Sequence, residues 1–186
     1  GHSNFVRGVL FSLDGSKIVS YSNDDTIRIW DILSGKQLQL LRGHSNEVNC
    51  VQFLSDNSKF VSCSKDKTIQ IWDISSGRQI QLLQGHSNNV YRVKISPDGS
   101  KIVSCSFDKT IRVWDVSSGN QILLLEGHTD FVRSASFSPD GTKIISCSDD
   151  KTIRIWNTSS RDQILLLKGH QKSVRDAQFF PDSTKI

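Results

Sequence analysis

The sequence predicts an all-β fold made of one four-stranded antiparallel unit repeated along the chain. The dipeptide Gly-His recurs at residues 1, 43, 85, 127 and 169, and Trp recurs at residues 30, 72, 114 and 156, always 42 residues apart. Within each period, short stretches alternate apolar and polar residues and are rich in β-branched and aromatic side chains, which is typical of strands. No stretch keeps a sustained helical period.

The second unit shows how the strands are predicted one by one. Residues 48–54 (VNCVQFL), 59–64 (KFVSCS), 68–73 (TIQIWD) and 78–83 (RQIQLL) each place their apolar residues on one side of an extended chain. The turn sequence SDNS separates the first two stretches. The unit therefore contains four short strands in succession.

The turns agree with this assignment. Residues 96–100 (SPDGS) and 138–142 (SPDGT) place Pro where φ is near −65° and Gly where φ can be positive. The sequences SSGR and SSGN connect the third and fourth strands through a Gly that suits a left-handed conformation. In the fourth unit Arg161 replaces this Gly. Because a left-handed non-Gly residue costs roughly 1 kcal/mol, we expect that turn to be either strained or rebuilt.

Four-stranded units of this period resemble the blades of a β-propeller. The Gly-His and Trp-Asp pairs make the resemblance specific, and the chain is similar to WD40-repeat proteins over its whole length. Units one to three keep Trp-Asp, whereas the fourth has Trp156-Asn157. The resemblance predicts a β-propeller of four-stranded antiparallel blades with an incomplete ring in one chain. We expect one propeller segment over residues 1–186, with repeats 1–42, 43–84, 85–126 and 127–168 and a partial repeat 169–186 that supplies the innermost strand of a fifth blade.

Each complete unit carries a His, a Ser, an Asp and a Trp at fixed spacing. The sets are His2, Ser20, Asp24, Trp30; His44, Ser62, Asp66, Trp72; His86, Ser104, Asp108, Trp114; and His128, Ser146, Asp150, Trp156. Ser, His and Asp also form the triad of serine hydrolases, but a fourfold repetition without a GxSxG motif argues against one catalytic nucleophile. In the family, these four residues form a hydrogen-bonded chain inside each blade. The resemblance therefore implies a structural network.

The sequence predicts neither an enzyme nor a cofactor. Its glycines lie in turns and form no phosphate-binding motif, and its five histidines are spread one per unit, which argues against a metal cluster. No apolar run approaches the roughly 18 residues of a membrane span, and no signal peptide precedes the first motif. The cysteines, Cys50, Cys63, Cys105 and Cys147, form no metal or redox motif. We expect them to be small buried residues in a reducing, cytoplasmic environment.

The repeats differ most around the Val that follows Gly-His and just before the network Asp. In WD40 proteins these places surround the top face of the propeller, where partners dock, and the resemblance therefore implies a protein or peptide partner. The predicted partner-binding residues are Phe5, Arg7, Asn23, Glu47, Asn49, Lys65, Asn89, Tyr91, Phe107, Phe131, Arg133, Asp149 and Arg175. Aromatic and Arg side chains on an exposed rim are common interface anchors. The alternative is that some of them pack between neighbouring blades.

The function favoured by the sequence is a non-enzymatic scaffold for protein–protein interaction. One alternative is a sensor or regulatory module cut from a larger multidomain signalling protein. Another is nucleic-acid binding by a basic face that carries Lys17, Lys59, Lys101, Lys143 and Lys185. The net charge of +4 is too weak to support nucleic acid by itself, and Asp14, Asp56, Asp98, Asp140 and Asp182 offset much of this ring.

Four units leave the ring of a typical propeller incomplete. The chain is then expected to be a fragment of a longer WD40 protein, a small closed ring of four blades, or half of a homodimer that completes a ring of about eight blades. We predict a fragment in origin that associates with a second copy, since uncovered apolar blade faces favour association.

Overall fold

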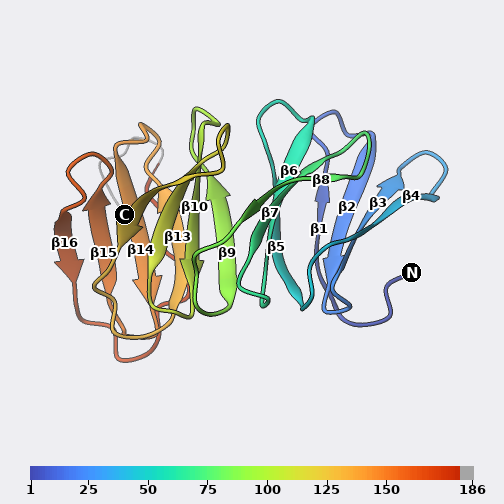
Figure 1. The fold of residues 1–186 in the computed structure, drawn as a ribbon. Helices are drawn as coiled ribbons and strands as arrows, with labels where there is room; N and C mark the ends of the chain where they lie inside the picture. The colour runs from blue at the N-terminus through green and yellow to red at the C-terminus, as the bar shows by residue number, and fades with distance from the viewer. Residues whose placement is uncertain (181–186) are drawn as a thin grey trace. The chain divides into compact units, whose positions relative to one another are not determined.

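The structure, a computed structural model, describes residues 1–180, and in this range it contains strands and no helix. Four sheets form, each from four strands that are consecutive in the sequence (Figure 1). All pairings are antiparallel. The predicted all-β fold of four-stranded antiparallel blades is therefore confirmed. Lys185 and Asp182, two members of the predicted charged ring, lie outside the described residues.

The strands begin and end close to the predicted positions. In blade 1 they are β1 (Val6–Phe11), β2 (Lys17–Ser22), β3 (Thr26–Asp31) and β4 (Gln37–Arg42), and in blade 2 they are β5 (Val48–Phe53), β6 (Lys59–Ser64), β7 (Ile69–Asp73) and β8 (Gln79–Leu83). In blade 3 they are β9 (Val90–Ile95), β10 (Lys101–Ser106), β11 (Ile111–Asp115) and β12 (Gln121–Leu125). In blade 4 they are β13 (Val132–Phe137), β14 (Lys143–Ser148), β15 (Ile153–Asn157) and β16 (Gln163–Leu167).

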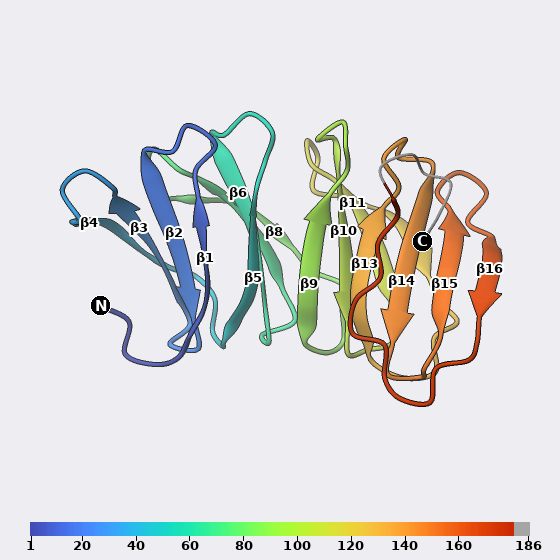
Figure 2. The same cartoon turned by 180° about the vertical axis from the view of Figure 1, so that it is seen from behind.

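The chain divides into two compact units. Unit 1, Gly1–Gly85, holds blades 1 and 2, and unit 2, which starts at His86, holds blades 3 and 4. Within each unit the first strands of the two blades are neighbours, β1 beside β5 and β9 beside β13 (Figure 2). In every blade the first strand begins at the end of the sheet where the second strand ends, and we call this the first-strand end.

The core of each unit lies between its two sheets. In unit 1 it comprises Val19, Ile27, Ile29 and Leu41 from blade 1 and Val48, Val51, Phe60, Trp72 and Ile74 from blade 2. The rings of Phe60 and Trp72 stack with centroids 6.2 Å apart. In unit 2 the core comprises Val103, Cys105, Ile111, Val113, Leu123 and Leu125 from blade 3 and Val132, Ala135, Phe137, Ile144 and Trp156 from blade 4. Blades are therefore held together by apolar burial, because no backbone ladder joins one sheet to the next.

The turn between the first and second strands is closed by a Ser–Asp pair. In blade 3, Ser96 Oγ donates to Asp98 over 2.5 Å and accepts from the backbone N–H of Lys101 over 2.9 Å. Gly99 and Gly141 have φ values of 74° and 71°, the left-handed conformation that the SPDG sequences predict.

The residues that follow β16 differ from the prediction. Residues 169–180 form no strand, although they repeat the sequence of the first strand region. The segment lies alongside β13 (Figure 2), where the backbone N–H of Val174 donates to the Ser148 carbonyl over 3.1 Å and the Val174 side chain is buried. In each blade the ladder of the first strand is made by the second strand of the same repeat, and no such strand is present beside residues 169–180.

The turn at Arg161 is strained rather than rebuilt. Arg161 has a φ of 68°, close to the 71° of Gly119 at the equivalent position. Its N–H donates to the Asn157 carbonyl over 3.1 Å, as the Gly119 N–H does to Asp115 over 2.9 Å. Arg161 thus keeps the turn of the other repeats with a side chain that disfavours it.

We predict that Arg161→Gly stabilises the protein by about 0.5–1 kcal/mol, because the relief of left-handed strain exceeds the added entropy of the unfolded chain. Urea unfolding followed by circular dichroism measures the change. Arg161→Ala is the matched control, since it removes the guanidinium and keeps the Cβ, and it should bring no gain. A loss of stability in Arg161→Gly would contradict the assignment of strain.

Candidate functional site

The same chain of hydrogen bonds occurs in every complete repeat. In blade 3, His86 Nδ1 lies 2.7 Å from the Asp108 carboxylate and Nε2 lies 2.8 Å from Ser104 Oγ, and Trp114 Nε1 donates to that Oγ over 2.9 Å. The corresponding distances are 2.7–2.9 Å in the sets His2–Ser20–Asp24–Trp30, His44–Ser62–Asp66–Trp72 and His128–Ser146–Asp150–Trp156. The structure therefore brings together all sixteen residues of the predicted network, four in each blade.

Protonation states in unit 2 set the direction of these bonds. Burial lowers the pKa of His86 and of His128, although Asp108 and Asp150 lie beside them. Burial opposes ionisation of the two Asp, but hydrogen bonds outweigh it, so the pKa of Asp108 lies well below its usual range and that of Asp150 falls to about 2. A neutral His beside a carboxylate carries its hydrogen on Nδ1, so Nε2 accepts the Ser hydroxyl and the Ser oxygen accepts the indole N–H.

Two further residues of each repeat belong to the network and were not predicted. Thr110 Oγ1 donates to Asp108 over 2.7 Å, and Ser106 Oγ accepts the Asp108 N–H over 3.0 Å and donates to the Asn88 carbonyl over 3.1 Å. Thr26, Thr68 and Thr152 and Ser22, Ser64 and Ser148 make the same bonds. Their recurrence at the period of 42 residues was the available signal.

The network Asp also fixes the first-strand end of its blade. Asp108, in the turn after β10, accepts the backbone N–H of Ser87, which lies in the loop before β9, over 3.0 Å. Equivalent bonds join Ser3 to Asp24, Ser45 to Asp66 and Thr129 to Asp150 over 2.9–3.1 Å. One carboxylate thus holds the two connections that carry the predicted partner-binding residues.

The arrangement does not support nucleophilic catalysis. Ser104 is fully buried, and its oxygen already accepts the Trp114 N–H. A nucleophile must reach its substrate and needs its lone pair available for attack. The Ser, His and Asp of each blade satisfy one another inside the sheet.

A β-bulge recurs at the first-strand end of every blade. Val6 pairs with Ser22 and Gly8 with Tyr21, which leaves Arg7 without a partner in the ladder. The same irregularity leaves out Asn49 in β5, Tyr91 in β9 and Arg133 in β13. A bulge turns its extra residue away from the regular alternation of the strand. All four bulge residues are predicted partner-binding residues, and sequence reasoning had found the positions without the bulge.

A backbone bond gathers the other predicted positions around each bulge. The N–H of Asn23, Lys65, Phe107 and Asp149 donates to the carbonyl of Phe5, Glu47, Asn89 and Phe131, respectively, over 2.9–3.0 Å. The three predicted residues of each repeat therefore meet at one end of the blade, and the residues of neighbouring blades within a unit touch.

In unit 1 the resulting cluster is polar and charged. Arg7 donates to Asn23 over 2.5 Å and to Glu47 over 3.0 Å, and Lys65 lies 3.4 Å from the same Glu47 carboxylate. Burial opposes ionisation of Glu47, but the bonds from Arg7 and Lys65 hold its pKa below the usual value. Phe5 stands at the edge of this cluster and is 79% exposed.

In unit 2 the cluster is aromatic. Phe107 stacks between Phe131 and Tyr91, with ring centroids 4.3 Å and 5.3 Å away. The Arg133 guanidinium carbon lies 4.8 Å from the Phe107 centroid, and Arg133 Nε donates to Asp149 over 2.9 Å. Burial here is partial, since the side chains of Arg133 and Asp149 are 26% and 14% exposed. The stack leaves a large and nearly rigid aromatic surface next to a satisfied ion pair.

Arg175 lies in the segment after β16 and completes the predicted set. Its side chain is exposed, and its charge helps to hold the pKa of Asp149 low, after the larger effects of the Arg133 bond and of the Ser173 hydroxyl. Asn89 contributes the carbonyl that orients Phe107.

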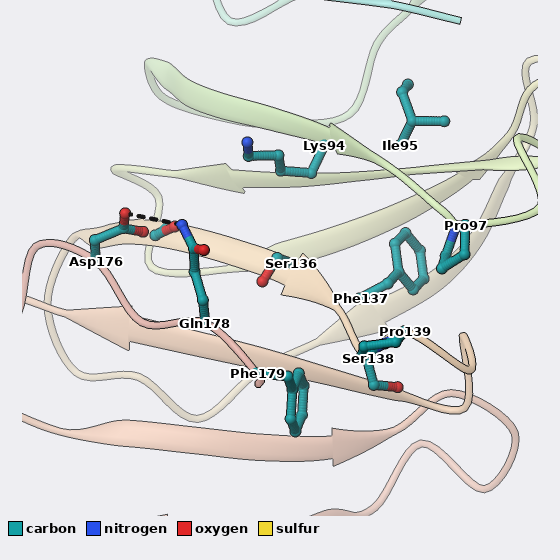
Figure 3. Close-up of a pocket in the computed structure, with 11 residues that line it drawn as sticks. Lys94, Ile95, Pro97, Ser136, Phe137, Ser138, Pro139, Asp176, Gln178 and Phe179 are labelled. Carbon is teal, nitrogen blue, oxygen red and sulfur yellow. Dashed lines mark hydrogen bonds between the residues drawn. The ribbon is translucent and has the colours of Figure 1, made fainter. Parts of the chain in front are cut away.

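Unit 2 also contains a cavity of about 250 Å³ between β9, β13 and residues 176–179 (Figure 3). Its polar wall includes Lys94, Ser136 and Gln178, which occupy one repeat position at the period of 42 residues, and its apolar wall includes Phe137 and Phe179. Arg92 lies 3.4 Å from Ser134 and 3.2 Å from Asp176, which again share one repeat position. Equivalent positions on adjacent inner segments therefore touch, a rule that the period could have supplied.

The four described lysines of the predicted basic ring begin the second strands, as expected. Lys101 lies 3.8 Å from Asp98, so part of its charge is offset locally. No described segment is a helix with the length and apolar character needed to cross a membrane.

The fold and the repeated network define a class of protein, the β-propellers made of WD-type blades. The family model for the WD domain, G-beta repeat, matches residues 1–31, 35–73, 77–115 and 119–157, and the chain belongs to the WD40 family. A 38-residue stretch is 47% identical to nuclear distribution protein nudF of Aspergillus niger. A 42-residue stretch is 55% identical to an uncharacterized WD repeat-containing protein, sll1491, of Synechocystis, and a 37-residue stretch is 49% identical to Lissencephaly-1 homolog 1 of Paramecium tetraurelia. These stretches cover 20–22% of this chain and only 9–12% of the relatives.

We predict that the free energy of unfolding falls as the pH is lowered from about 7.5 to about 5. The pKa values of His86 and His128 are lowered in the folded state, so the unfolded chain binds more protons once the pH drops below about 6.5. A second loss follows below about pH 4, where Asp66 and Asp150, whose folded pKa values are about 2, become protonated in the unfolded chain.

Urea titrations at a series of pH values measure this dependence. His86→Ala should reduce the slope between pH 7.5 and 5, whereas His170→Ala, at an exposed position, should leave it unchanged. A midpoint that stays constant over this range would show that the buried histidines are not neutral.

Proposed function

We propose that the protein is a non-enzymatic scaffold that binds a protein or peptide partner at the first-strand ends of its blades, the top face of a WD40 propeller. The observation that carries this proposal is the repeated bulge, which presents Arg7, Asn49, Tyr91 and Arg133 outside the ladder on an otherwise constant frame. Bulges are common where a fold re-aims a side chain for function. The names of the relatives add that WD repeats occur in a nuclear distribution protein.

The composition of these ends supports an interface rather than a small-molecule site. Aromatic and Arg side chains provide most of the energy in protein interfaces, and Tyr91, Phe107, Phe131 and Arg133 supply both kinds in contact with one another. A pre-stacked surface loses little conformational entropy on binding. The buried network Ser supports the non-enzymatic part of the proposal. We propose a cytoplasmic location, which suits reduced cysteines.

The predicted roles of individual residues are part of the proposal. The sets from His2 to Trp156 would serve as the structural network, and the set from Phe5 to Arg175 would serve as partner-binding residues. The division into repeats 1–42, 43–84, 85–126, 127–168 and 169–186 would make each repeat the unit that carries one of each.

We predict that Phe131→Ala and Arg133→Ala each weaken partner binding at least about tenfold, because both remove part of the aromatic–Arg cluster. The partner is captured from an extract with the wild-type chain, identified by mass spectrometry and produced for calorimetry. Arg161→Ala is the matched control, since it removes an Arg at the opposite end of blade 4 and should leave the Kd unchanged. Circular dichroism checks that the variants are folded. An unchanged Kd in both variants would place the partner elsewhere.

We also propose self-association into a homodimer that completes a ring of about eight blades. In blade 1, Val9 and Phe11 are 62% and 66% exposed, whereas Val51, the counterpart of Val9 in blade 2, is 1% exposed. The uncovered side of blade 1 thus has the apolar composition that blades use to pack on one another.

We predict a solution mass of two chains by light scattering. Val9→Ser combined with Phe11→Ser should give the mass of one chain, because these side chains form the uncovered face. Leu33→Ser is the control: Leu33 is equally apolar and 97% exposed, but it lies in the turn after β3. A wild-type chain that remains a monomer at all concentrations would overturn the homodimer.

A further inference from the structure

Blade 2 contains two cysteines that face each other across a strand pair. In the β5–β6 ladder, Cys50 is the register partner of Cys63. Register partners in an antiparallel pair point to the same side of the sheet, so the two thiols share one face. All four cysteines of the chain are reduced. The sequence analysis had noted that Cys63, Cys105 and Cys147 occupy one repeat position, and it had not recognised what Cys50 faces.

No other blade repeats this pairing. The equivalent partners are Gly8 with Tyr21 in blade 1, Arg92 with Cys105 in blade 3 and Ser134 with Cys147 in blade 4. The Cys50–Cys63 pair is therefore a departure of one blade from the shared pattern, at a position where every blade has a different pair of residues.

The ladder places the two Cα atoms within the range of a disulfide. The Leu54 N–H donates to the Lys59 carbonyl over 2.9 Å, which makes that pair a hydrogen-bonded one. Hydrogen-bonded and non-hydrogen-bonded pairs alternate along the ladder, so Cys50 and Cys63, four steps further, are again of the hydrogen-bonded type with Cα atoms about 5.5 Å apart. Disulfides join Cα atoms at about 4.4–6.8 Å, most often near 5.5–6 Å.

The bulge at Asn49 gives this pair the freedom to close. The ladder skips Asn49 between Val48 and Cys50, so the end of β5 is not held in strict register. Side chains in a hydrogen-bonded pair stand slightly apart, and a small shift of the bulged strand brings the sulfurs together. Cys50 is half-buried, whereas Cys63 is fully buried, so an oxidant reaches Cys50 first.

We propose that Cys50 and Cys63 are an oxidation site that forms a reversible cross-strand disulfide when the protein meets a peroxide. The sulfur of Cys50 attacks one peroxide oxygen, the O–O bond breaks, and Cys50 becomes a sulfenic acid with release of one water. The sulfur of Cys63 then attacks the sulfenic sulfur, the S–S bond forms and the S–O bond breaks. The leaving hydroxide takes the Cys63 proton and departs as a second water. A thiol reductant restores both thiols by exchange.

The disulfide would act at the proposed partner-binding end of blade 2. Asn49 precedes Cys50 directly, and Lys65, which bonds to Glu47, lies two residues after Cys63. Closing the bond draws in the bulge that presents Asn49. This consequence rests on the proposed function, whereas formation of the bond does not.

Peptide mapping of the intact chain tests the bond. The folded protein is treated with hydrogen peroxide, the remaining thiols are alkylated in denaturant, and the chain is digested with trypsin. Cys50 falls in peptide 43–59, Cys63 in 60–65, Cys105 in 102–109 and Cys147 in 144–151. We expect peptides 43–59 and 60–65 to be joined, with a mass lower by two hydrogens, and to separate after dithiothreitol. Peptides 102–109 and 144–151 should be alkylated.

Two variants decide between this bond and unspecific oxidation. Cys63→Ala should abolish the joined species and leave Cys50 as a sulfenic or sulfinic acid, and Cys105→Ala should leave the joined species unchanged. Two alkylated peptides after peroxide, sulfinic acid at Cys50 in the wild-type chain, or a bond to Cys105 or Cys147 would each overturn the proposal. The mapping requires no partner, so its outcome is independent of whether the scaffold function holds.

Discussion

The buried Asp of each repeat is the group on which the rest of the blade depends. Asp108 accepts hydrogen bonds from His86, from the Thr110 hydroxyl and from the backbone N–H groups of Ser87 and Thr110. These partners outweigh the desolvation of the carboxylate, which a buried charge requires. The same carboxylate therefore orients the His–Ser–Trp chain inside the sheet and holds the two connections at the first-strand end in place.

This constraint separates the frame from the surface. Inside the frame, every polar group has a partner from the same repeat, so one repeat can be copied without a change in its neighbours. Between the sheets of a unit, contact is apolar and tolerates exchange among β-branched and aromatic residues, such as Phe60 in blade 2 and Ile144 in blade 4. What remains variable is the bulge residue and the two residues beside it, whose side chains carry no obligation to the network.

The sequence predicted the strands and the network because both follow from local pattern and period. It predicted the positions of the partner-binding residues from the differences between repeats, but it could not predict which of them touch. Arg7 meets Glu47 from the next blade, and Arg133 meets Phe107 from the preceding one, contacts that depend on the distance between neighbouring first strands. The fate of residues 169–180 was also beyond local pattern, since strand formation requires a pairing partner as well as a suitable sequence. The Cys50–Cys63 pair depends on register, which is fixed by the hairpin turn and the bulge together.

The two units show how far one frame can be specialised. At equivalent positions, unit 1 gathers Arg7, Asn23, Glu47 and Lys65, and unit 2 gathers Tyr91, Phe107, Phe131 and Arg133. Solvent-exposed ion pairs contribute little net affinity but favour partners of complementary charge, whereas stacked aromatics contribute most of the energy through burial. A partner that spans a unit of the first kind is selected by charge, and one that spans the second is held by contact area. Because both clusters rest on the same buried carboxylates, a change in their side chains alters recognition without a change in the fold.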